Sequence, residues 1–246
     1  ARIADEGWLL PRAGFGVVPA GSDCDLLVIF ASGHRAGIAP RWFNLRQQQV
    51  RGAAATAYCV GAFVAPRATG VEDYVGAFAV TAGLELEEQA GAFEAANDDY
   101  NSILLKSLAD RLAEAYAEYL HLRVRREFWG YAPDEELEGE ALIRERYRGI
   151  RPAPGYPACP DHTEKRTLWQ LLGVADRIGI ELTESCAMWP PASVSGWYFA
   201  HPQSRYFQIG RIGDDQLQDY ARRKGWSRSE AERWLAPVLT LKADAA

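Results

Sequence analysis

Short runs of β-branched and aromatic residues, separated by glycine and proline, fill the chain up to about residue 90. They predict five strands, over Phe15–Val18, Asp25–Phe30, Arg41–Leu45, Tyr58–Val64 and Tyr74–Thr81. The last run is apolar at nearly every position, which is typical of a strand covered on both faces. Small residues such as Gly61 and Gly76 indicate the close approach of a ligand, another backbone or a packed helix.

A helical pattern follows from about Ala92 to Phe128. A helix of that length extends on the order of 50 Å, enough to back a whole sheet. Apolar residues recur at spacings of three to five and predict one buried stripe, made of Leu104, Leu108, Leu112, Ala115, Tyr119 and Val124. We expect most of a second stripe, made of Asp110, Glu114, Glu118 and His121, to face solvent.

Prolines mark the next part of the chain. A short charged helix is predicted over Asp134–Tyr147, and the ten residues Arg151–Pro160 then contain four prolines and one glycine. Neither a helix nor a central strand tolerates that density, so we predict a stiff, extended loop. Asp161 and Glu164 resemble a capping box, which predicts a helix that ends near Ile178, before Gly179.

The C-terminal part alternates strand and helix patterns. Strands are predicted over Glu181–Ser185, Val194–Ala200 and Tyr206–Ile212, the last two joined as a hairpin by residues 201–204. Helices are predicted over Asp215–Lys224 and Ser229–Leu235, the second behind a capping box of Ser227 and Glu230. The pattern as a whole predicts an α+β fold with a mainly antiparallel sheet. The absence of repeats and low-complexity linkers favours one domain over residues 1–246.

Composition and charge exclude several classes of protein. The 27 basic and 33 acidic residues give a net charge of −6, which argues against non-specific binding to nucleic acid or anionic membranes. The sequence has no signal-peptide pattern and no apolar run long enough for a membrane span. Four scattered cysteines favour reduced thiols in a cytoplasmic protein. The chain starts at Ala1 and its only methionine is Met188, so we expect it to be part of a longer polypeptide.

Two segments are candidates for binding chemistry. In the proline-rich loop, Arg151 offers a planar fork for a carboxylate or phosphate, Gly155 permits close approach to the backbone, and Tyr156 offers a flat face. The alternative is a structural loop whose arginine caps a helix. The segment 188–199 contains Trp189 and Trp197, which suit either the wall of a site for a large flat ligand or core packing.

Motifs for common catalytic chemistry are missing from the sequence. There is no GxGxxG fingerprint, P-loop, GxSxG elbow or paired-carboxylate motif. Cys159 and His162 stand three apart, but a second pair of ligands for a structural metal site is missing. We therefore expect neither a metal site nor classical hydrolytic catalysis.

Six runs of sequence carry a family resemblance. They are DYVGAFAVTAGL (73–84), ADRLAEAYAEYLH (109–121), GIRPAPGYPACPDHTEK (149–165), LTESCAMWP (182–190), SVSGWYF (193–199) and DYARRKG (219–225). In this order they resemble the C-terminal activation domain of cobalamin-dependent methionine synthase, over about Arg12 to Pro237. The resemblance implies one C-shaped α+β domain with a twisted antiparallel sheet and one long helix.

The resemblance also implies a function. The family's activation domain binds S-adenosylmethionine and supplies its methyl group for the reductive methylation of cob(II)alamin, so the chain would be a methyltransferase module of methionine biosynthesis. Its partners would be a cobalamin-binding domain, in the same or another chain, and a flavodoxin or flavoprotein reductase that donates the electron. The sulfonium is a good leaving group, so the transfer needs orientation rather than an acid or base.

Seven positions match ligand contacts of that family. Arg151 would hold the ligand's carboxylate, Ala153 would contribute backbone contacts, and Gly155 and Tyr156 complete the RxxxGY motif. The remaining matches are the acidic residue Glu114 and the aromatic pair Tyr206 and Phe207. An aromatic face beside a sulfonium contributes ~0.5–2 kcal/mol. An N-terminal helical segment with a further acidic contact, present in the family, has no equivalent in this sequence.

Two other interpretations remain open. The chain could be a free-standing S-adenosylmethionine-binding protein that docks on a separate corrinoid protein as a reactivation partner or sensor. It could also be a structural domain that has lost ligand binding.

The cobalamin-binding Asp-x-His-x-x-Gly motif and the zinc cysteines of the homocysteine site are absent, so this chain alone cannot complete methionine synthesis. Under the favoured interpretation, we expect Tyr156 and the segment 188–195 to face the corrin ring.

Overall fold

The computed structural model describes residues 2–30, 38–48 and 56–240. Its contacts divide the chain into two compact units. The first unit comprises Ala1–Gly16, Gly76–Arg148 and Leu168–Tyr198, and the second comprises Val17–Val75, Gly149–Thr167 and Phe199–Ala246. A five-stranded sheet has the order β3 (Ile38–Phe43), β2 (Leu26–Phe30), β1 (Arg12–Asp23), β4 (Asp73–Thr81) and β7 (Ser193–Tyr198). Strands β1 and β4 contribute residues to both units. The α+β class predicted from the sequence is confirmed.

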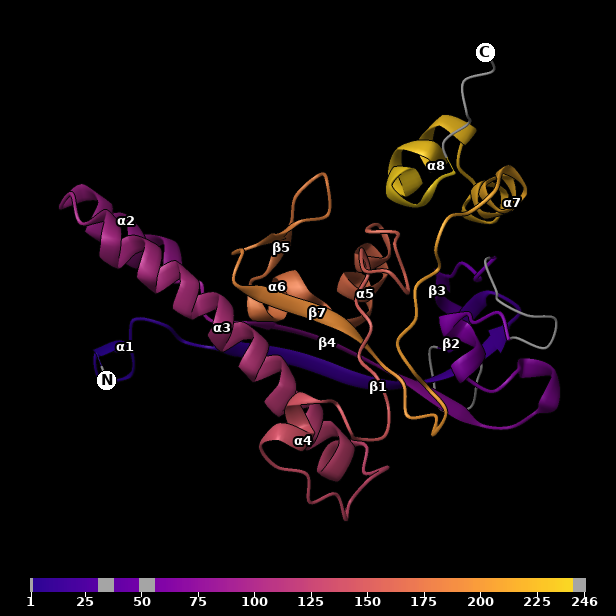
Figure 1. Ribbon diagram of the computed structural model, residues 1–246, viewed down its shortest axis with the longest axis horizontal. Helices are drawn as coiled ribbons and strands as arrows, with labels where there is room; N and C mark the ends of the chain where they lie inside the picture. The colour runs from indigo at the N-terminus through magenta and orange to yellow at the C-terminus, as the bar shows by residue number, and fades with distance from the viewer. Residues whose placement is uncertain (1, 31–37, 49–55, 241–246) are drawn as a thin grey trace. The chain divides into compact units, whose positions relative to one another are not determined.

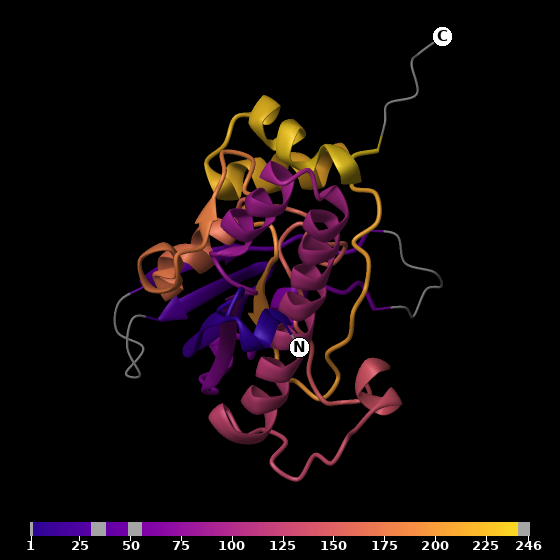
Figure 2. The same ribbon diagram turned by 90° about the vertical axis from the view of Figure 1, so that its left-hand side faces the viewer.

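Two helices dominate the first unit, where the sequence predicted one (Figures 1 and 2). Helix α2 (Leu86–Ala95) and helix α3 (Asp99–Arg123) pack against each other. The break lies at Asn97, which has a φ of 56°, and at Asp98, whose carboxylate accepts a hydrogen bond from the Asn101 N–H at 3.1 Å. This cap starts a new helix, because it satisfies an amide that otherwise has no intrahelical partner.

Helix α3 buries a different face from the one predicted, although Val124, directly after the helix, is fully buried as predicted. Leu104, Leu108 and Leu112 are 40–41 % exposed, and Tyr119 is exposed as well. The buried side chains form a neighbouring stripe, in most turns one position further along the chain: Ser102, Leu105, Ala109, Ala113, Ala117, Leu120 and His121. Small alanine side chains let the helix backbone approach strand β7 (Ser193–Tyr198) closely, which bulky leucines do not allow.

His121 is the clearest exception to the predicted solvent-facing stripe. Its ring is fully buried and stacks on Tyr198, with centroids 4.8 Å apart. Helix α3 then continues into a π-helical turn, Val124–Phe128, which carries Arg125 into the interior. The Arg125 guanidinium pairs with Glu135 at 2.7 Å and lies 3.7 Å from the centre of the Tyr147 ring. This pairing compensates the buried charge.

Strands β4 and β7 form the antiparallel pair of the first unit. Residues 75–81 of β4 are all buried, as the apolar run predicts. Gly76 faces Tyr198, and a Cβ atom on Gly76 would lie 2.8 Å from the Cβ atom of that tyrosine. The small residue in this strand therefore makes room for an aromatic neighbour.

The other elements of the first unit are short. They are α1 (Arg2–Asp5), α4 (Glu140–Ile143), α6 (Val174–Ile178), β5 (Glu181–Leu182) and β6 (Met188–Trp189), and β5 pairs with β6. The helix predicted over Asp134–Tyr147 is reduced to α4, which begins after Gly139 at a φ of 53°. The helix predicted up to Ile178 is two helices, α5 (Glu164–Leu172) and α6, because Gly173 between them has a φ of 61°.

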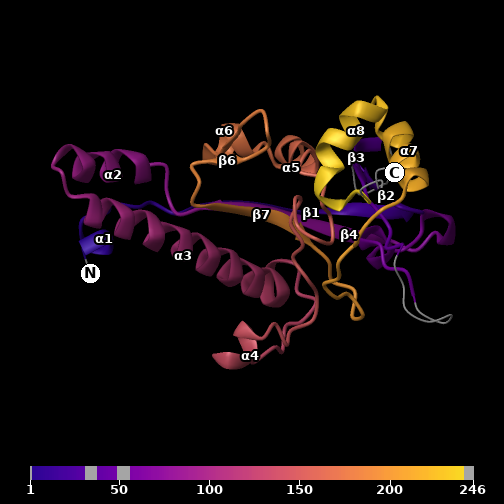
Figure 3. The same cartoon turned by 45° about the horizontal axis from the view of Figure 1, so that its top comes forward.

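The second unit packs a helix pair beside strands (Figure 3). Strands β2 (Leu26–Phe30) and β3 (Ile38–Phe43) are antiparallel, and helix α7 (Asp214–Lys224) contacts β3 and α8 (Arg228–Leu235). The predicted Ser227 cap of α8 is confirmed, since its hydroxyl accepts the Glu230 N–H at 3.2 Å. Three short 3₁₀ turns, Val60–Phe63, Arg67–Thr69 and Ala236–Val238, complete the unit.

Two strands predicted for the second unit are wrong. Tyr58–Val64 forms the 3₁₀ turn Val60–Phe63, because its amides bond to carbonyls three residues earlier. Tyr206–Ile212 is an irregular segment, and so the predicted hairpin is absent from this described part of the chain. Its amides bond to scattered carbonyls, from Ile209 to Pro157 and from Ile212 to Val238. None of the described helices has the length and apolar character of a membrane span.

The buried face of α3 can be tested with two substitutions. We expect Ala117→Leu to lower the free energy of unfolding by about 1–3 kcal/mol, because Ala117 packs fully buried against Phe78 and Tyr198. Leu108→Ala on the neighbouring exposed stripe should change it by less than about 1 kcal/mol. Urea unfolding with unchanged m values is the measurement. If Leu108→Ala lowered the free energy of unfolding more than Ala117→Leu does, the leucine stripe would be the buried face.

Candidate functional site

The proline-rich segment is a loop, as predicted, but it folds back on itself instead of being extended. The Gly155 N–H donates to the Cys159 carbonyl at 2.8 Å, and the Cys159 N–H donates to the Tyr156 carbonyl at 2.9 Å. The Cys159 thiol donates to the Ala153 carbonyl at 2.8 Å. These bonds close residues 153–159 into two tight turns. Together with Arg151 and Pro152 they form a segment that we name the ligand loop, after the ligand contacts that the sequence predicts for it.

Gly155 is required by the geometry of the ligand loop. Its φ is 96°, in the region that favours glycine. A Cβ atom at this position would lie 2.2–2.7 Å from three ring atoms of His162. Any side chain at position 155 would therefore collide with the imidazole ring, and either the ring or the loop would have to move.

A second segment lies against the ligand loop. The Tyr206 hydroxyl accepts a hydrogen bond from the Arg151 N–H at 3.0 Å, and the Ile209 N–H donates to the Pro157 carbonyl at 2.9 Å. These bonds bring together two segments that are about 50 residues apart in the sequence. Tyr206 and Tyr156 are 44 % and 62 % exposed, so both rings are accessible.

The structure brings six of the seven predicted contact residues into these two segments of the second unit. They are Arg151, Ala153, Gly155, Tyr156, Tyr206 and Phe207. Phe207 differs from its neighbour, because its ring packs inward, with its centre 5.6 Å from that of Tyr58. Its observed role is therefore packing beneath the segment, and a ligand contact of Phe207 stays a prediction.

A buried ionic cluster anchors the end of the ligand loop. Lys224, in the last turn of α7, lies 2.7 Å from Glu164 and 3.1 Å from Asp161, with all three side chains at most 10 % exposed. The Tyr220 hydroxyl donates to Asp161 at 2.6 Å, and Glu164 accepts the Phe43 N–H at 3.3 Å. The sequence suggested only a capping box here, and the cap that forms is the Thr163 N–H bonded to Asp161.

Burial changes the acid strength of this cluster. Removal of Glu164 from solvent raises the pKa of its carboxyl group to about 7, and the negative charge of Asp161 acts in the same direction. The ammonium group of Lys224 opposes both effects. Burial beside these carboxylates also raises the pKa of Tyr220 well above its ordinary value. Two carboxylates thus share one ammonium group behind the loop.

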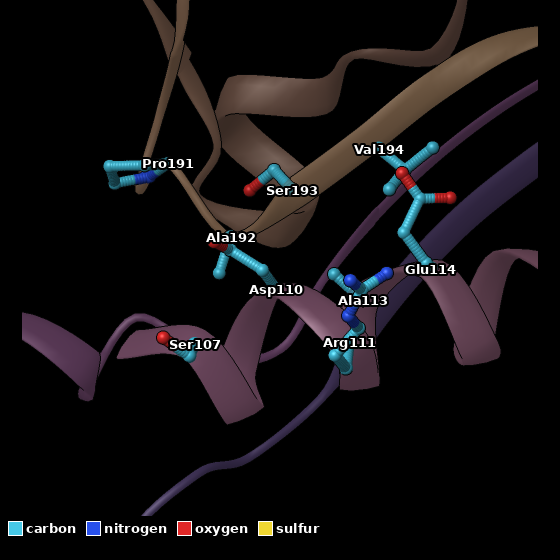
Figure 4. Close-up of a pocket in the computed structure, with 9 residues that line it drawn as sticks. All are labelled: Ser107, Asp110, Arg111, Ala113, Glu114, Pro191, Ala192, Ser193 and Val194. Carbon is cyan, nitrogen blue, oxygen red and sulfur yellow. The ribbon is translucent and has the colours of Figure 1, made fainter. Parts of the chain in front are cut away.

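Glu114, the seventh predicted residue, lies in the first unit on α3. It is exposed and lines a cavity of about 460 Å³ (Figure 4). The cavity is bounded by Ser107, Asp110, Arg111 and Ala113 on the same helix and by the segment Pro191–Val194. Figure 4 shows the Glu114 carboxylate pointing from the helix toward Val194. The cavity offers two carboxylates and one guanidinium group to an incoming polar group.

The second candidate segment divides into two environments. Trp197 is fully buried on β7, so core packing explains it, whereas Trp189 is 47 % exposed. The backbone around Trp189 is fixed, because the Ser193 hydroxyl donates to the Pro190 carbonyl at 2.7 Å and the Ala82 N–H donates to the Ala192 carbonyl at 3.0 Å. Trp189 is therefore an accessible aromatic side chain on a fixed backbone.

Metal ligation has no visible support at the Cys159–His162 pair. The described residues contain no group of three or more histidine, cysteine or acidic side chains with suitable geometry. Burial raises the pKa of the Cys159 thiol well above its ordinary value, and the thiol is already bonded to Ala153. A protonated, buried thiol is a poor metal ligand.

Comparison with known proteins identifies the family. Residues 1–225 match the family model described as the activation domain of vitamin B12-dependent methionine synthase. The chain belongs to this family, which confirms the resemblance seen in the sequence. The crystal structure of the MetH reactivation domain bound to AdoHcy is similar to it, with a TM-score of 0.95 and 56 % sequence identity. The match covers 98 % of this chain and 74 % of that one.

The protonation of Glu164 can be tested through stability. A pKa raised from 4.5 to about 7 means that the folded state binds this proton more tightly than the unfolded state does. The proton's contribution to the free energy of unfolding is therefore complete below pH 4.5 and is lost as the pH rises to about 7. Glu164→Gln mimics the protonated form, because its amide oxygen can accept from Lys224 and Phe43 and its NH2 group can donate to the Thr167 hydroxyl. We expect the free energy of unfolding of the variant, relative to that of the parent, to rise by about 3 kcal/mol between pH 4.5 and 7.5.

Urea unfolding at several pH values measures this difference. Glu232→Gln is the matched control, because the Glu232 side chain is 44 % exposed and pairs only with Arg228 among the described contacts. The parent and the control should show the same pH dependence. A constant difference between the parent and Glu164→Gln would contradict the raised pKa.

Proposed function

We propose that this chain binds S-adenosylmethionine, and its product S-adenosylhomocysteine, at the ligand loop. One observation carries the proposal: the loop and the Tyr206 segment form a closed, hydrogen-bonded unit in a chain 56 % identical to a domain whose structure holds AdoHcy. Both ligands carry an α-carboxylate, an ammonium group and an adenine ring. The loop region offers a counterpart for the carboxylate and for the ring.

The residues of the loop suit those ligand groups. Arg151 is partly buried, and a guanidinium fork that has lost part of its hydration pairs strongly with a carboxylate. The backbone at Gly155 carries no side chain, so a ligand can approach it closely. The exposed rings of Tyr156 and Tyr206 offer faces for an adenine ring or a sulfonium group. Glu114 remains a predicted contact to a polar group of the ligand.

We further propose that the bound ligand serves the reductive methylation of cobalamin. S-adenosylmethionine supplies an electrophilic methyl group, and a flavodoxin or flavoprotein reductase supplies the electron that cob(II)alamin needs. A cobalamin-binding domain holds the cobalamin. The contribution of this chain is to hold and orient the methyl donor, which explains why the transfer requires no acid, base or nucleophile from it. The chain then acts as a methyltransferase module within methionine biosynthesis.

Two exposed aromatic residues suit a surface that meets the corrin ring. Tyr156 belongs to the ligand loop of the second unit, and Trp189 belongs to the fixed segment before β7 in the first unit. Flat, accessible aromatic rings on fixed backbones lose little entropy when they contact a large flat partner. We propose that each contacts the cobalamin domain during reactivation.

Ligand binding is tested by titrating the chain with S-adenosylhomocysteine and S-adenosylmethionine in a calorimeter. We expect binding to the parent and at least tenfold weaker binding to Arg151→Ala, because a charge-assisted pair is lost. Arg222→Ala is the matched control, since Arg222 is an exposed arginine of α7 in the same unit. Glu114→Gln should also weaken binding, whereas Glu88→Gln, which changes an exposed carboxylate on α2, should not.

The two possible failures of this titration have different meanings. Absence of binding to the parent would overturn the proposed function. Binding that is equal in the parent and in Arg151→Ala would leave the function in place but would remove the carboxylate contact from Arg151.

The reactivation role is tested with a cobalamin-loaded partner domain, S-adenosylmethionine and reduced flavodoxin. Formation of methylcobalamin is followed by its absorption spectrum. We expect Trp189→Ala to slow this step about fivefold or more while its affinity for S-adenosylhomocysteine stays unchanged, because the tryptophan contacts the partner rather than the ligand. Ile143→Ala, which removes an 82 % exposed side chain from α4, is the control. A rate equal to that of the parent would remove Trp189 from the docking surface.

A further inference from the structure

His162 occupies the space beside Gly155 that a side chain would otherwise fill. A Cβ atom built on Gly155 would lie 2.2 Å from Cε1, 2.5 Å from Nδ1 and 2.7 Å from Nε2 of the imidazole. The ring is thus in direct contact with the α-carbon of the residue at the centre of the ligand loop. The sequence around Gly155 and the sequence around His162 do not predict this contact.

Lys165 fixes the orientation of this imidazole ring. Its side chain is in the first turn of α5, the residue is only 6 % exposed, and its Nζ atom lies 3.0 Å from Nδ1 of His162. An ammonium group can only donate, so Nδ1 accepts and the ring proton is on Nε2. Burial and the neighbouring ammonium charge both lower the pKa of His162. The imidazole is therefore neutral at pH 7.

We propose that His162, hydrogen-bonded to Lys165, is a positioning residue that supports Gly155 and so holds the ligand loop in the conformation that binds the adenosyl ligand. The inference rests on the proposed function, because it concerns the same loop. His162 acts through Gly155 rather than through the reacting atoms.

The hydrogen bonds of the loop show how this support is transmitted. The Gly155 N–H bonds to the Cys159 carbonyl, and the next amide, from Tyr156, bonds to the Ala153 carbonyl at 3.2 Å. A shift of Gly155 into the space of a missing ring would break or lengthen both bonds. The Tyr156 ring and the Ala153 backbone would then move away from a ligand held by Arg151.

Acid should weaken the same support. A protonated His162 would place two positive charges 3.0 Å apart and would lose the lone pair that accepts from Lys165. The charged groups that act on His162 are Lys165 and Asp161, and the titratable residues Cys159 and Glu164 lie within three positions of it in the sequence. Asp161 favours the protonated form, but its effect is smaller than those of burial and Lys165.

A double-mutant cycle in ligand binding tests the inference. Calorimetry with S-adenosylhomocysteine at pH 7.5 is applied to the parent, Gly155→Ala, His162→Ala and the double variant. We expect each single substitution to weaken binding about tenfold or more, and Gly155→Ala to cost at least threefold less once the His162 ring is absent. Additive effects would overturn the inference, since they would mean that His162 does not act through Gly155.

The pH profile of affinity gives a second, independent readout. The parent should lose affinity as the pH falls below 6.5 toward 5. The affinity of His162→Gln should not change over this range. At pH 7.5 this variant should bind more tightly than His162→Ala, because its amide oxygen can accept from Lys165. Glu164→Gln is the control and should keep the acid loss. A parent profile that is flat, or a His162→Gln profile with the same acid loss, would overturn the inference.

Failure of the inference can be distinguished from failure of the proposed function. If the parent does not bind at any pH, the function fails. If the parent binds and both His162 variants bind as tightly as it does, only the inference fails. Thermal unfolding of each variant checks folding, and where His162→Ala is unfolded, the His162→Gln profile decides.

Discussion

The pairing of Lys224 with Asp161 and Glu164 is the interaction on which the binding region most depends. It joins the residues that directly follow the ligand loop to the last turn of α7, about 60 residues later in the chain. The cluster depends above all on the ammonium group, because loss of Lys224 would leave the buried carboxylates of Asp161 and Glu164 without an opposite charge. The cluster therefore fixes the far end of the loop more strictly than apolar packing alone would.

The near end of the loop is held by a different kind of contact. The Arg151 N–H donates to the Tyr206 hydroxyl and the Ile209 N–H donates to the Pro157 carbonyl, and both bonds fix the loop against a segment with no regular structure. Prolines reduce the number of conformations that the loop can adopt when unfolded, so little entropy is lost when it becomes ordered. Together these contacts hold the proposed binding surface in place although its backbone is neither helix nor strand.

Local sequence signals predicted the structural features that depend only on residues close together in the sequence. The prolines of the loop, the glycine at 155, the cap at Ser227 and the apolar run of β4 are such signals, and each is found in the structure. The exposed face of α3 was not predictable in the same way, because leucine and alanine stripes run side by side and only the close approach of β7 selects between them. Lys224 and His162 were missed since their roles depend on residues brought together by folding.

The alanine face of α3 has a thermodynamic consequence. Alanine has no side-chain rotamers to lose, so this face packs without the entropy penalty that leucine or methionine would carry. It also hides little apolar area, and the heat-capacity change on separating a helix from its sheet scales with that area. The attachment of α3 should therefore vary less with temperature than the core of the second unit, which is rich in leucine, isoleucine and aromatic side chains.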